Sequence, residues 1–85
     1  MTEDEYARVR PVIEMAQRLH NSLHHKLAEN GVEGIDALIA STYATHNLAT
    51  TLHGGNPVAA IEWMRDALDT IERQALAASG RGRLN

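Results

Sequence analysis

The chain has 85 residues, of which 22% are charged, carries a formal net charge of −3 and contains no cysteine. A chain of this length supports one domain with a modest core, and the absence of cysteine excludes disulfides and thiolate metal sites. Its basic residues are scattered rather than gathered into the concentrated face that phosphate binding requires, so we expect no nucleic-acid partner.

The first residues, Met1 to Glu5, are acidic and polar. They lack the basic stretch and apolar run of a secretory signal, so we expect a cytoplasmic protein. Further on, no charged side chain occurs between Asp36 and Glu62. That stretch is long enough to cross a bilayer, but its many threonine, serine, asparagine and histidine residues exclude a membrane span.

A first helix is predicted over residues 3–29. Thr2 followed by Glu5 has the spacing of a capping box, in which each side chain satisfies a backbone donor of the other residue. Apolar residues then recur at intervals of three and four. Because this period continues unchanged through Pro11, we expect one kinked helix, the alternative being a short first helix that ends near Val9.

A second helix is predicted over residues 33–53, after Asn30 and Gly31, which tolerate left-handed backbone angles. Its threonines make it intrinsically weak, so packing must hold it. It also has no charged solvent face, which a helix of a small bundle normally has, so we expect a second copy or another protein to cover it. The predicted interface is its sector of mostly small residues, with Ala40, Ala44, Asn47 and Thr51, together with Leu48 from the adjoining apolar side.

A third helix is predicted over residues 57–79. Gly54 and Gly55 end the second helix, and Asn56 before Pro57 is the pattern of an N-cap followed by proline at the first helical position. We expect residues 80–85 to form a flexible tail. The apolar residues of this third helix repeat at three and four, giving a narrow seam like that of a coiled coil: Ile61, Met64, Leu68, Ile71 and Ala75.

Trp63, the only tryptophan, lies outside this seam with Ala67 beside it on the helical wheel. A large aromatic residue among small neighbours is typical of an interface anchor. The alternative is that Trp63 folds over the rim of its own bundle. We include Trp63 and Ala67 in the predicted interface.

The chain is enriched in one residue type that could carry chemistry, since it has five histidines. Imidazole titrates near neutrality and commonly binds metals. His20 and His24 share one face of the first helix, and His46 and His53 share one face of the second. If these helices form a hairpin, His20, His24 and His46 could converge as a zinc set. The histidine pair lacks the adjoining glutamate of the metalloprotease motif, and no carboxylate lies on the same faces to give a di-iron set.

The sequence therefore leaves two functions open for the histidines. They could line a small-ligand pocket together with Tyr43, using His20, His24, His46 and His53. They could instead be boundary or interface residues that bond to threonine hydroxyls or backbone carbonyls of the uncharged helix. His25 lies on the charged side of its helix, where we expect it to be solvated.

No nucleotide or catalytic motif is present, and we name no catalytic residue. The pattern predicts an all-α protein with a single domain over residues 1–79, folded as a three-helix up-down-up bundle. We expect its second helix to lie in a homodimer interface. The predicted function is a non-enzymatic interaction or regulatory module without a cofactor, and the alternative is the histidine-lined binder of a small ligand or metal.

Overall fold

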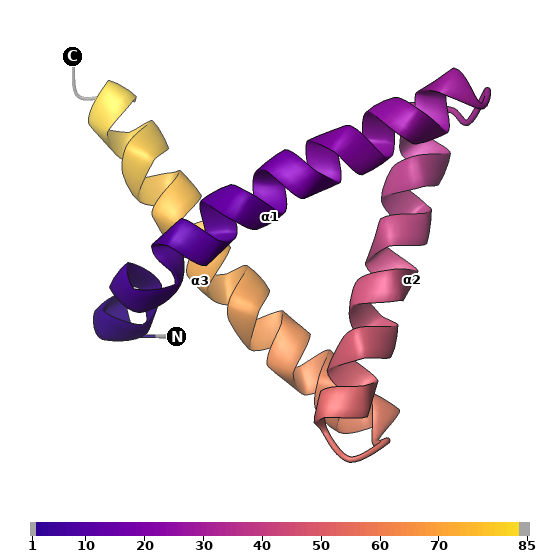
Figure 1. Cartoon of the computed structure of the whole chain (residues 1–85). Coiled ribbons are helices and arrows are strands. Elements are labelled where there is room, and N and C mark those ends of the chain that lie inside the picture. Colours follow the sequence, from indigo (N-terminus) through magenta and orange to yellow (C-terminus); the bar gives the residue numbers. More distant parts are fainter. Residues whose placement is uncertain (1, 84–85) are drawn as a thin grey trace. The chain divides into compact units, whose positions relative to one another are not determined.

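A computed structural model describes residues 2–83 of the chain. It contains three helices in chain order, α1 (Glu3–Glu29), α2 (Gly34–Leu52) and α3 (Pro57–Arg83), which Figure 1 draws from indigo to yellow. No strand occurs among these residues. The predictions of an all-α protein and of three helices are therefore confirmed.

At the start of α1 the structure shows the Thr2 half of the predicted capping box. Thr2 has an extended backbone, and its hydroxyl oxygen accepts a hydrogen bond from the backbone N–H of Glu5 at 3.1 Å. Acidic residues fill the first turn, where they face the positive end of the helix dipole. The helix continues through Pro11 without a break, and Figure 1 shows it changing direction in its N-terminal part. Proline causes such a bend because it lacks the N–H and its ring clashes with the preceding turn.

The turn after α1 is a Schellman motif. The N–H of Val32 donates to the Leu27 carbonyl and the N–H of Gly31 donates to the Ala28 carbonyl, both at 3.0 Å. Gly31 takes the left-handed conformation with φ of 80°, whereas Asn30 has φ of −94°. Of the two residues predicted to end the helix, Gly31 therefore takes the left-handed conformation and Asn30 is the C-cap.

Threonines occur throughout α2, and their hydroxyls bond to their own helix. Each hydroxyl donates to the carbonyl four residues earlier, at 2.8–3.2 Å: Thr42 to Leu38, Thr45 to Ser41, Thr50 to His46 and Thr51 to Asn47. The donor of each of these hydroxyls is therefore satisfied within its own helix. The helix begins one residue later and ends one residue earlier than the sequence pattern predicts.

The turn between α2 and α3 uses two glycines and an asparagine cap. Gly54 and Gly55 have φ of 67° and 83°, and the N–H of Gly55 donates to the Thr50 carbonyl at 2.8 Å. The side-chain oxygen of Asn56 then accepts from the N–H groups of Val58 and Ala59, each at 3.1 Å. The predicted N-cap of α3 is therefore present with two bonds.

The end of α3 differs from the expected one. We expected a flexible tail over residues 80–85, but the helix continues through Gly80 to Arg83, and residues 84–85 lie outside the described residues. A glycine costs a helix about 1 kcal/mol, yet a helix that has already formed adds one hydrogen bond with each further residue. The loss at each glycine is thus too small to end the helix.

The chain divides into two compact units. One consists of Thr2–Thr45, with α1 and the first part of α2, and the other begins at His46 and contains the end of α2 and α3. The buried apolar residues are small: Ala37 in the first unit, and Ala49 and Ala60 in the second. Larger apolar side chains lie exposed on every helix. The predicted single domain and up-down-up bundle stay predictions.

Candidate functional site

Most of the interface predicted from the sequence lies on α2. Leu48 is 62% exposed and Trp63, on α3, is 53% exposed. Ala67 differs from the others because it is half-buried. The small and polar members of the set are all exposed: Ala40, Ala44, Asn47 and Thr51.

The hydroxyls of α2 bear directly on whether this surface can be covered. A hydroxyl that leaves water without a hydrogen-bond partner costs roughly 1–3 kcal/mol. The hydroxyls of Thr45 and Thr51 avoid this cost, since they already donate to carbonyls of α2. No charged residue lies between Asp36 and Glu62. This part of α2 can therefore be covered by a partner without stranding a charge or a threonine donor.

His46 connects α2 to the start of α3, and His53 bonds back to α2. Nε2 of His46 lies 3.1 Å from the carbonyl oxygen of Pro57, and Nδ1 of His53 lies 2.7 Å from that of Ala49. A carbonyl only accepts, so these bonds place a proton on Nε2 of His46 and on Nδ1 of His53. Ala49 lies between the two histidines on this face of α2 and is buried, as is Ala60 on α3. Small side chains here let the two helices approach closely.

The ring of His53 also contacts Trp63. Their centroids are 6.2 Å apart and their planes meet at 51°, a tilted arrangement favourable for aromatic pairs. Trp63 nevertheless keeps about half of its surface exposed. Its histidine-facing side therefore packs on its own chain, and the anchor and rim interpretations both stay predictions.

Another histidine pair lies in the unit Thr2–Thr45. The rings of His20 and His24 are 6.4 Å apart, and Nε2 of His24 is 3.0 Å from the hydroxyl oxygen of Ser41 on α2. Tyr43, predicted to line a pocket with these residues, is 74% exposed. The residues predicted to bind a ligand thus make two separate sets of contacts, one at Ser41 and one at the turn before α3.

Sequence reasoning missed Ser41 and the Pro57 carbonyl as histidine partners. Ser41 lies four residues after Ala37, so the two share a face of α2, and both are shielded from water there. The spacing of four between Ala37 and Ser41 is the sequence signal that could have placed Ser41 on the covered face. The sequence could not identify the Pro57 carbonyl as a partner of His46, because that bond depends on how the turn folds.

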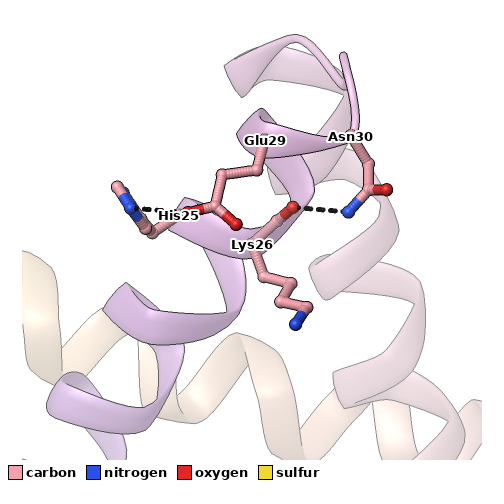
Figure 2. A network of polar contacts seen from close by, with 4 residues as sticks. All are labelled: His25, Lys26, Glu29 and Asn30. Carbon is pink, nitrogen blue, oxygen red and sulfur yellow. Dashed lines mark hydrogen bonds and ion pairs between the residues drawn. The ribbon is translucent and has the colours of Figure 1, made fainter.

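Figure 2 shows the polar contacts at the end of α1. Nε2 of His25 lies 3.1 Å from a carboxylate oxygen of Glu29, and the Asn30 amide donates to the Lys26 carbonyl at 2.8 Å. The side chains of His25 and Glu29 are 79% and 59% exposed. His25 is therefore solvated as predicted, and these contacts finish a helix rather than form a pocket.

Among the described residues, no group of three or more histidine, aspartate or glutamate side chains is placed to hold a metal ion. The zinc set of His20, His24 and His46 therefore has no geometric support. None of the described helices combines the length and apolar character needed to cross a lipid bilayer. Comparison with protein-family models, curated proteins and solved structures finds no match to this chain.

Proposed function

We propose that this chain is a small interaction or regulatory module, without catalysis of its own, that associates through α2 and Trp63 with a protein partner, most simply a second copy. One observation carries the proposal. After Asp36, α2 has no charged residue, yet Tyr43 and Leu52 are each 74% exposed and Leu48 is 62% exposed. An exposed helix without charges and with large apolar side chains is typical of a surface that a partner covers.

Two further features support association at this surface. The threonine hydroxyls along α2 are bonded internally, which lowers the desolvation cost of covering the helix. Trp63 presents a half-exposed indole held on one side by His53, and an aromatic residue so placed is the kind that dominates binding energy. We propose the cytoplasm as its location, where a chain without cysteine needs no disulfides.

The proposed architecture is the up-down-up bundle. Only four residues, 30–33, connect α1 to α2, and four residues, 53–56, connect α2 to α3. Connections this short are typical of helices that pack as antiparallel neighbours. In such a bundle the sector with Ala40, Ala44 and Thr51 faces outward, so the partner would meet α2 at its smallest side chains, where two helices can approach most closely.

Substitution of Ala44 tests the proposed function. Ala44→Arg puts an unpaired charge into the contact, which costs roughly 3 kcal/mol or more, so we expect the dissociation constant of the assembly to rise by about a hundred-fold or more. Asn21→Arg adds the same charge on the exposed face of α1 and is the control. Sedimentation equilibrium of both variants gives the comparison. An Ala44→Arg protein that assembles like the Asn21→Arg protein would contradict the proposal.

A further inference from the structure

The apolar seam of α3 is incompletely covered in the structure. Leu68 is 60% exposed, Ile71 is 55% exposed and Ile61 is 39% exposed. The flank of α3 that meets its own chain lies to one side of this seam, where Ala60 is buried and Ala67 is half-buried. A continuous row of large and small apolar side chains therefore runs beside the covered flank.

The sizes of the side chains along this row are graded. Ile61 and Met64, at its N-terminal end, are large, and Ala75 and Ala78, at its C-terminal end, are small. An antiparallel second copy of α3 would set large against small in the outer layers and would pair Leu68 with Ile71 of the other copy at the centre. A parallel copy would set alanine against alanine and leave a gap there. Layers of large against small side chains fill space well, so the gradation favours the antiparallel arrangement.

Charges on the other flank of the seam also favour an antiparallel second copy. Arg65 and Glu72 both lie there, seven residues apart and exposed. Among the described residues neither takes part in an ion pair. In the antiparallel register that pairs Leu68 with Ile71, Arg65 of each copy lies close to Glu72 of the other. An antiparallel dimer has a two-fold axis between its copies. The Arg65–Glu72 pair therefore occurs twice, once on each side of that axis.

We infer that α3 is a homodimerisation helix, which pairs antiparallel with α3 of a second copy through Ile61, Met64, Leu68, Ile71, Ala75 and Ala78, flanked by Arg65–Glu72 pairs. This inference deepens the proposed function, on which it rests for the premise that the chain associates. It identifies the partner as a second copy and adds a contact on α3 to the one on α2. The alternative cover for the seam is the remainder of the same chain, as in the proposed bundle, which would leave α2 as the contact between copies.

A charge exchange in the full chain tests this pairing. Arg65→Glu and Glu72→Arg each replace two attractions with two repulsions, so each should weaken the dimer roughly ten-fold at low salt. The double variant Arg65→Glu with Glu72→Arg restores opposite charges and should return the dissociation constant to within about two-fold of the unsubstituted chain. Glu62→Arg, on the far face of α3, makes the same charge change as Glu72→Arg and should have little effect.

Sedimentation equilibrium of these proteins decides between the outcomes, with circular dichroism to check that each variant keeps its helices. Weakening by the single changes and recovery in the double variant support the antiparallel pairing. A monomeric unsubstituted chain, single variants that dimerise normally, or a double variant as weak as the single ones would overturn it. If Ala44→Arg dissociates a dimer that the charge variants leave intact, the α3 pairing is wrong and the proposed function of α2 stands.

Disulfide trapping tests the orientation separately, because the chain has no cysteine of its own. An Ile61→Cys chain and an Ala78→Cys chain, mixed in equal amounts and mildly oxidised, should yield mainly the mixed disulfide, since residues 61 and 78 are paired in the antiparallel register. If the main products instead join two copies of the same variant, the helices are parallel and the proposed orientation is overturned.

Discussion

His46 donates a hydrogen bond from Nε2 to the carbonyl oxygen of Pro57, 3.1 Å away, and so joins α2 to the first residue of α3. The bond spans the turn that contains Gly54 and Gly55. Because Pro57 fixes its own backbone angle and Asn56 caps the helix beside it, the imidazole meets a carbonyl whose position is already restricted. The turn therefore has side-chain support in addition to its glycines.

Removing this imidazole should destabilise the protein. His46→Ala deletes one hydrogen bond in a half-buried place, so we expect the free energy of unfolding to fall by about 1 kcal/mol. His25→Ala is the matched control, because it makes the same change in helix propensity at an exposed site, where the imidazole contacts only the surface carboxylate of Glu29. Urea titration at one protein concentration measures the free energy of unfolding of both variants. Equal losses in the two variants would show that the Pro57 bond does not contribute.

The glycine at position 55 should resist substitution for a backbone reason alone. Its φ is 83°, and a Cβ added there would meet no atom within 4 Å, so Gly55→Ala should cost about 1–2 kcal/mol of strain without a steric clash. Gly34→Ala is the control, because Gly34 lies in α2 without a positive φ and with equally open space. Alanine there should stabilise by about 0.5 kcal/mol. Thermal unfolding that moves in the same direction for both variants would contradict this account.

The contact between His24 and Ser41 should appear as an energetic coupling between α1 and α2. Their side chains are 3.0 Å apart and 17 residues apart in the chain. A double-mutant cycle of His24→Ala and Ser41→Ala should give a coupling of about 0.5–1 kcal/mol. The same cycle for His20 and Ser41 is the control, since the Ser41 hydroxyl bonds to His24 and not to His20. Strictly additive changes for His24 and Ser41 would argue against the bond.

Local signals in the sequence were sufficient for the helices and their caps. Thr2, Asn56 and Pro57 act as their residue types predict, because a capping side chain bonds to a backbone only two or three residues away. The end of α3 could not be read in this way. A glycine such as Gly80 lowers helix stability without fixing where the helix stops, so composition alone overestimated the tail.

The partners of the histidines were predicted by kind and not by identity. The sequence indicated threonine hydroxyls or backbone carbonyls. Carbonyls are the partners of His46 and His53, whereas His24 bonds to the hydroxyl of Ser41, which was not a predicted partner. The threonine hydroxyls, which were candidates for these bonds, instead bond within α2. Such choices depend on how closely two helices approach, and a hydrophobic pattern does not determine that distance.

The central claim is that a second copy of the chain covers the uncharged surface of α2. Native mass spectrometry of the chain, purified without a metal-affinity tag and compared with the Ala44→Arg variant, tests it most directly. We predict a dimer with no added mass for the unsubstituted chain and a monomer for Ala44→Arg. A chain that stays monomeric at all concentrations, or a dimer that Ala44→Arg leaves unchanged, would contradict the claim.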